Sequence, residues 1–221
     1  MQKFRPLAIV GFCAIAMAAA TFGPARAAAI TIEYSGIIQY ILDPTGTPGG
    51  TFSASGGPVV GNTFSGVFSF DPGDAVPAGS PFLNVSSYDF LPGTVFPTLI
   101  LNGAGVDLKP KIDLAIGNDF DLTASADLSL NWFKFGIEQL NSGVVPNSID
   151  GIVISGDEMG FDSNFGTGFE ITLFSFDPAG AALPDEAVPD PLMLLGNTFF
   201  LFQEYVRDEE QAAGYGVVTA A

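Results

Sequence analysis

The sequence contains no histidine, a single cysteine and few basic residues, and each shortage excludes a class of function. Without histidine the chain has neither the usual general base nor the commonest zinc ligand, so Ser-His-Asp and Cys-His catalysis are excluded. Seven Lys and Arg stand against 24 Asp and Glu, for a formal net charge of −17. A chain this acidic is a poor partner for nucleic acid or anionic lipid.

The first 27 residues have the features of a secretory signal peptide. Lys3 and Arg5 form a basic start, Leu7–Ala20 is an apolar run, and residues 25–27 (Ala-Arg-Ala) form a cleavage site. The run is shorter than the roughly 20 residues that a membrane-spanning helix needs. We expect cleavage after residue 27, which also removes Cys13, so the mature chain has no disulfide and no membrane anchor. The sequence therefore predicts a secreted protein, extracellular or periplasmic.

Abundant glycine, proline and phenylalanine indicate many short strands joined by turns. The chain has 27 Gly, 16 Pro and 21 Phe, and its apolar content is too high for a disordered protein. We predict an all-β fold, a single jelly-roll-like β-sandwich over residues 28–221 with long Pro/Gly-rich loops, such as 43–62. The expected strands are Ile30–Leu42, Thr63–Asp71, Val85–Phe90, Val95–Leu101, Lys111–Ile116, Asp119–Trp132, Ile149–Ser155, Phe169–Phe176, Thr198–Val206 and Gly216–Thr219.

The most regular alternation of apolar and polar residues lies in Asp119–Trp132. A period of two residues is typical of a strand with one buried face. After Trp132 the apolar phase shifts by one residue, which predicts a bulge or bend there. Farther along, Gln203–Ala213 lacks an apolar stripe, which favours a polar hairpin loop over a helix.

Two groups of oxygen-bearing side chains are candidate calcium ligands, because calcium prefers carboxylate and amide oxygens. Neither group matches the spacing of an EF-hand or of a nonapeptide repeat. Carboxylate clusters are also expected by chance in so acidic a chain, and a solvated strand surface is the alternative interpretation. The groups are Asn118, Asp119, Asp121 and Asp127, and Asp157, Glu158 and Asp162.

For catalysis the sequence leaves only a carboxylate pair of the kind glycosidases use, with Asp157, Glu158 and Asp162 as the densest candidates. Such an enzyme needs an aromatic-lined cleft, but the chain has one Trp and five Tyr, and its Phe residues lie at core positions. We therefore predict no catalytic residues and no enzyme. Carbohydrate binding by ring stacking would use exposed aromatic platforms such as Trp132, Tyr88, Tyr205 or Tyr215, but the apolar phase of Trp132 instead predicts core packing.

Three loose sequence patterns of the mature chain resemble the PEP-CTERM, or exosortase-sorted, family of exported proteins. They are Phe64–Asp71, Ile116–Asp119, and the ending that runs from Phe169–Leu173 through Leu183-Pro184 to Gly214–Gly216. The family's defining tail, a Pro-Glu-Pro motif followed by an apolar segment and an Arg cluster, is absent from the end at 217–221. Residues 188–191 (Val-Pro-Asp-Pro) are only superficially similar to that motif, so sorting and anchoring do not carry over.

The resemblance implies an exported protein of an exopolysaccharide or biofilm matrix, with extracellular polysaccharide as its partner and no catalytic residues to transfer. Two hypotheses follow. The first is a secreted, non-enzymatic matrix or surface-associated protein, and the alternative is a calcium-assisted carbohydrate-binding module.

Overall fold

The computed structural model describes residues 29–53, 57–79, 84–90, 95–123, 129–158, 167–185, 196–206 and 209–220. The predicted signal peptide therefore lies outside the described residues. The elements are β1 (Ile30–Leu42), β2 (Thr63–Phe70), the short 3-10 helix η1 (Pro72–Asp74), β3 (Val76–Ala78), β4 (Val85–Phe90), β5 (Thr98–Leu101), β6 (Ala104–Val106), β7 (Ile112–Asp121), α1 (Ser129–Leu140), β8 (Ser148–Asp157), β9 (Thr167–Asp177), β10 (Asn197–Val206) and β11 (Glu209–Ala220).

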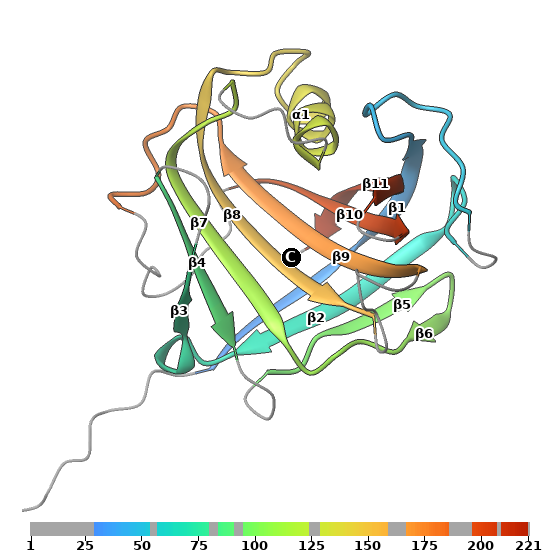
Figure 1. Cartoon of the computed structure of the whole chain (residues 1–221), viewed down its shortest axis with the longest axis horizontal. Helices are drawn as coiled ribbons and strands as arrows, with labels where there is room; N and C mark the ends of the chain where they lie inside the picture. Colours follow the sequence, from blue (N-terminus) through green and yellow to red (C-terminus); the bar gives the residue numbers. More distant parts are fainter. Residues whose placement is uncertain are drawn as a thin grey trace, which may run out of the picture.

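The described strands form one antiparallel sheet of 11 strands, in the order β3-β4-β7-β8-β9-β10-β11-β1-β2-β5-β6. Strands β7 to β11 follow one another as a meander, and β1 then pairs with β11 on one side and β2 on the other. The sheet curls so that β1 and β2 pass behind β7, β8 and β9, and β5 lies beside β2 (Figure 1). This confirms the predicted all-β, sandwich-like fold, while the strand order could not be derived from the sequence.

The main core fills the space inside the curled sheet. Its fully or nearly fully buried side chains come from both flanks, among them Phe68 on β2, Leu114 on β7 and Phe200 on β10. The Phe64 and Phe200 rings stack with centroids 4.3 Å apart, and Tyr34 stacks on Phe68 at 5.3 Å. Burial of aromatic side chains from both flanks holds the two halves of the sheet face to face.

A second core lies on the outer face of β8–β11, where α1 covers the sheet. Trp132 and Ile137 of α1 are fully buried there, and the Trp132 Nε1 donates a hydrogen bond to the Asp43 carbonyl at 2.7 Å. Consequently β10 is apolar on both faces: Phe199 packs under the helix while Phe200 packs in the main core. The prediction that Trp132 is a core residue is confirmed.

The predicted strand Asp119–Trp132 ends at Asp121 with β7, and it is wrong for residues 122–123, which form a turn, and for 129–132, which are helical. Trp132 belongs to α1, and no bulge forms there; the apolar residues after it follow a helical spacing, with Phe133, Ile137 and Leu140 at i, i+4 and i+7. The phase shift in the sequence therefore marks the change from a strand period to a helix period. The residues between β7 and α1, 124–128, lie outside the described residues.

The predicted loop at 43–62 folds back onto the sandwich. Phe52 packs edge-on against Phe202, and the fully buried Glu204 carboxylate accepts bonds from the Ser53 amide at 2.7 Å and hydroxyl at 2.8 Å. β10 and β11 pair as a hairpin, but the predicted polar loop over Gln203–Ala213 is wrong in extent, because β10 runs to Val206 and β11 begins at Glu209, before the predicted Gly216. No helix among the residues that the structure describes is long and apolar enough to cross a membrane.

Candidate functional site

The first predicted calcium group lies at the end of β7, where its described members make local hydrogen bonds. The Asp119 amide donates to the Asp150 carboxylate at 3.0 Å, and the Asp121 carboxylate accepts from the Thr123 amide at 2.7 Å and hydroxyl at 2.6 Å. The amide of Asn118 donates to the Asn84 carbonyl. Asp127 lies outside the described residues.

In the second predicted calcium group, one carboxylate is already paired with a lysine. Asp157 forms an ion pair with Lys109 at 3.0 Å, and burial raises the pKa of Glu158. Asp162 is not among the described residues. In the described ranges no three carboxylates come together as a group that could hold a metal ion. Calcium binding therefore stays a prediction.

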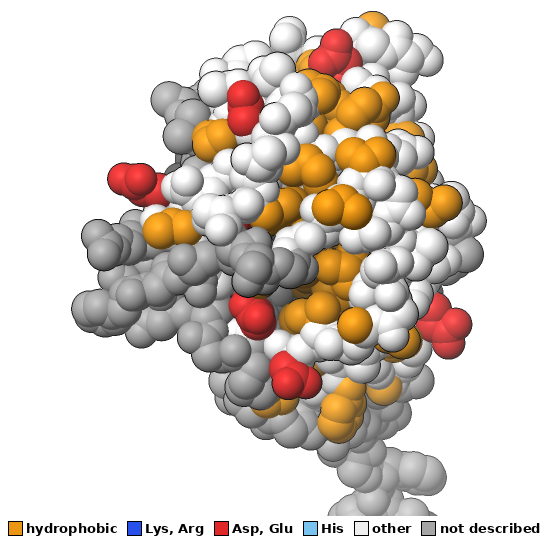
Figure 2. Space-filling model, turned by 90° about the vertical axis from the view of Figure 1, so that its right-hand side faces the viewer, with side chains coloured by type: hydrophobic (Ala, Val, Ile, Leu, Met, Phe, Trp, Pro, Cys, Tyr) orange, Lys and Arg blue, Asp and Glu red, His pale blue; other side chains and the backbone are white. Residues whose placement is uncertain are grey.

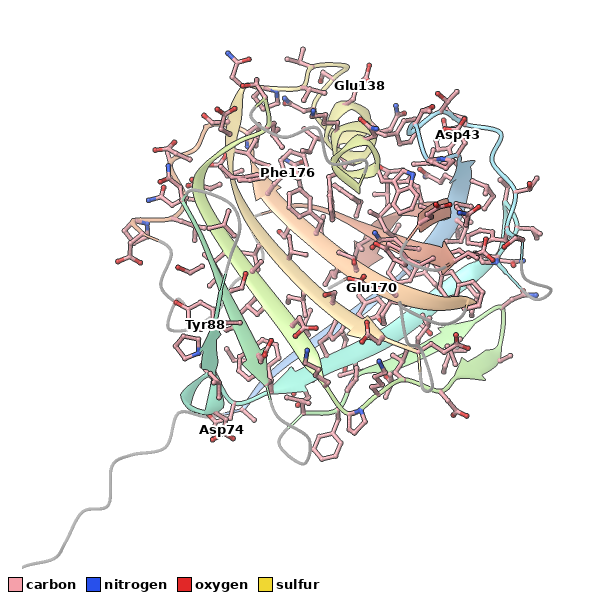
Figure 3. The ribbon with its side chains drawn as sticks, viewed as in Figure 1. Asp43, Asp74, Tyr88, Glu138, Glu170 and Phe176 are labelled. Atoms are coloured by element: carbon pink, nitrogen blue, oxygen red, sulfur yellow. The ribbon has the colours of Figure 1, made fainter. Side chains whose placement is uncertain are left out.

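A row of polar side chains, which the sequence did not predict, crosses the outer face of β4, β7, β8, β9 and β10. This polar row consists of Asp89, Asp113, Ser155, Asp157, Glu170 and Gln203. In register, Asp89 lies opposite Asp113, and Asp113 opposite Ser155, while Glu170 lies opposite both Asp157 and Gln203. Figure 3 shows Glu170 on β9, farther from α1 than Phe176 on the same strand. In the sequence these residues are visible only as polar residues at alternate positions of separate strands. The strand order is needed to show that they lie side by side.

Charge in this row is partly neutralised by lysine. The Lys111 ammonium lies 2.8 Å from Asp113 and 3.7 Å from Asp89. Burial and the nearby Asp89 raise the pKa of Asp113, and Lys111 opposes that rise. Burial, and then the negative charge of Asp157, raise the pKa of Glu170 to about 7, although a bond from Ser155 works in the opposite direction.

A cavity of about 350 Å³ opens beside this row, with Asp89, Lys111, Asp113 and Ser155 in its lining. Tyr88 also borders the cavity, but it packs against the main core. Small and aliphatic residues complete the described wall. The cavity thus offers carboxylates held by a lysine, without an aromatic platform among its described lining residues.

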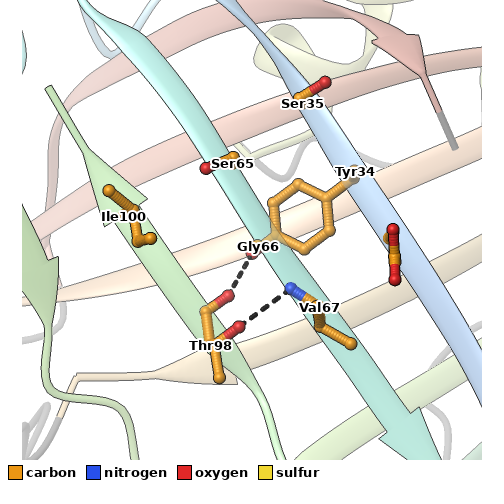
Figure 4. Close-up of a pocket in the computed structure, with 8 residues that line it drawn as sticks. Tyr34, Ser35, Ser65, Gly66, Val67, Thr98 and Ile100 are labelled. Carbon is orange, nitrogen blue, oxygen red and sulfur yellow. Dashed lines mark hydrogen bonds between the residues drawn. The ribbon is translucent and has the colours of Figure 1, made fainter. Parts of the chain in front are cut away.

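A larger groove, of about 480 Å³, runs over the outer face of β1, β2 and β5 (Figure 4). Its lining is chemically different from the polar row, since Glu33 is the one charged residue among the described residues that form it. The others are Tyr34, Ser35, Ser65, Gly66, Val67, Thr98 and Ile100.

The groove has a fixed floor because Tyr34 reaches across β2 beneath it. The Tyr34 hydroxyl donates to the Thr98 carbonyl at 2.9 Å, and the Thr98 hydroxyl in turn accepts the Val67 amide at 3.0 Å (Figure 4). Gly66 permits this crossing, since a Cβ there would lie 2.4 Å from the Tyr34 oxygen. The floor is therefore held by hydrogen bonds across three strands.

Comparison with known proteins adds no relative: no family model, no curated protein and no solved structure matches the chain. The fold and surface define it as an all-β protein with one curled antiparallel sheet. Of the predicted aromatic platforms, Trp132 and Tyr215 are fully buried and Tyr205 packs edge-on against Trp132.

Proposed function

We propose that the chain is an exported, non-enzymatic protein that works at the cell surface or in the extracellular matrix. The observation that supports this proposal is that the carboxylates form ion pairs and hydrogen bonds within the fold. Asp113 and Asp157 pair with lysines, while Asp43 and Asp177 accept backbone amides in turns. These acidic groups support strands and loops.

The closest resemblance to catalytic machinery is the pair Asp89 and Asp113, and its geometry favours a structural role. Hydrolases with two carboxylates place them on either side of the bond to be cleaved. Here both carboxylates come from neighbouring strands and share the Lys111 ammonium. Lys111 also opposes the rise in the pKa of Asp113 that burial and Asp89 cause.

The test is hydrolysis of polysaccharides by the purified chain, measured as release of reducing ends from neutral and acidic polymers. We expect background rates for the protein and for an Asp113→Asn variant alike, because both carboxylates pair with the same Lys111 ammonium. A reproducible rate that disappears in Asp113→Asn would overturn the non-enzymatic proposal.

A further inference from the structure

The groove over β1, β2 and β5 stands out by how few charged residues line it. The chain carries a net charge of −17, yet Glu33 is the one charged residue among the described lining residues. The three described lysines lie elsewhere, Lys109 and Lys111 beside the polar row and Lys134 on α1. The side of the molecule in Figure 2 shows hydrophobic and uncharged side chains, scattered acids, and no Lys or Arg on its described part.

The lining chemistry excludes several ligand classes. A nucleic acid or other polyanion needs basic residues, and a divalent cation needs several oxygen ligands, whereas this groove supplies one carboxylate. Protein interfaces are depleted in serine and rich in aromatic and arginine anchors. The groove has Ser35 and Ser65 and no arginine, and the hydroxyl of its one aromatic residue, Tyr34, is committed to Thr98.

What the groove does offer is hydroxyls interleaved with aliphatic side chains. The Ser35 and Ser65 hydroxyls can donate and accept hydrogen bonds, and the Thr98 hydroxyl, which accepts the Val67 amide, can still donate one. Ile100 is 48% exposed and the neighbouring Ile37 is 51% exposed. A sugar ring presents the same two features, hydroxyls that both donate and accept and C–H faces that pack on aliphatic groups.

We propose that this groove binds an uncharged polysaccharide, which lies along the outer face of β1, β2 and β5. The proposal rests on the proposed work of the chain outside the cell, where such polymers are its neighbours. Each contact is weak because the groove is open to solvent, and repeated sugar units along one polymer raise the apparent affinity.

The experiment is electrophoresis of the purified chain through native gels that contain dextran or hydroxyethyl cellulose, with an alginate gel as the charged comparison. Ser65→Glu places a carboxylate in the groove, and Ile100→Glu does the same at a more exposed position. Gln139→Glu adds the same charge on the exposed side of α1 and is the matched control. Thermal unfolding confirms that each variant is folded.

We expect one or both neutral gels to retard the protein and Gln139→Glu, with or without EDTA. Ser65→Glu and Ile100→Glu should each lose about tenfold or more in apparent affinity, since each places a larger side chain and a second carboxylate, in addition to Glu33, over the groove floor. Three results would overturn the proposal: no retardation in either neutral gel, equal retardation of the groove variants, or retardation that EDTA abolishes. Mobility is independent of polymer hydrolysis, so this failure is distinguishable from failure of the proposed function.

Discussion

The contribution of Glu170 to folding stability depends on pH. Its pKa is raised to about 7 by burial and by Asp157, above the 4.5 of an ordinary glutamate. A carboxyl with a raised folded-state pKa favours folding most below its unfolded pKa, and this contribution is lost as the pH rises through about 7. The polar row should therefore destabilise the protein more at pH 8 than at pH 5.

Replacing Glu170 with Gln keeps the shape and removes the titration. We expect Glu170→Gln to raise the free energy of unfolding at pH 8 by about 1–3 kcal/mol, allowing for partial exposure, and to change it little at pH 5. Urea unfolding at both pH values measures this. Glu138→Gln, on the exposed side of α1, is the control and should leave the pH dependence unchanged; identical profiles for both variants would contradict our interpretation of Glu170.

Individual residues were predictable where local pattern decides their environment. The apolar phase of Trp132 indicated burial, and the structure buries it completely. The row that joins Asp89, Asp113 and Glu170 was not predictable, because these residues are distant in sequence and meet only through strand pairing. Local periodicity carries no information about which strands become neighbours.

At the scale of elements, most strands were predictable and the helix was not. The predicted boundaries of Ile30–Leu42 and Val85–Phe90 match β1 and β4. The misassigned element was α1, because an alternating stretch runs directly into a helical one and the two patterns share Trp132. Tertiary packing onto the outer face of β10 decides in favour of the helix.

Close packing of α1 depends on Gly136. A Cβ at this position would lie 2.5 Å from the Phe199 ring, which is fully buried in the second core. Gly136→Ala should lower the free energy of unfolding by about 1–2 kcal/mol, because the overpacking cost exceeds the gain in helix propensity. Chemical denaturation measures the change.

Gly105→Ala provides a matched control, since nothing lies within 4 Å of a Cβ built there. This variant should leave stability nearly unchanged or raise it slightly. Equal effects of the two substitutions would show that α1 does not pack on β10 through Gly136.

At the scale of the whole molecule, composition indicated the all-β class, but the sequence did not indicate a second core. An expectation of one dry face per strand fails for β9 and β10, which are covered on both sides. The result is an outer surface of unlike regions: a helix-covered part, a polar row with lysines, and a nearly neutral groove. This distribution of charge over the outer surface is the basis for our proposal that the groove binds an uncharged polysaccharide.

The central claim, that the protein works outside the cytoplasm, is tested most directly by the N-terminus of the protein made in a bacterial host. Mass spectrometry of the periplasmic and medium fractions should find a chain that begins at Ala28, because the apolar run Leu7–Ala20 predicts export and residues 25–27 predict cleavage. An intact chain beginning at Met1 and confined to the cytoplasm would contradict the account.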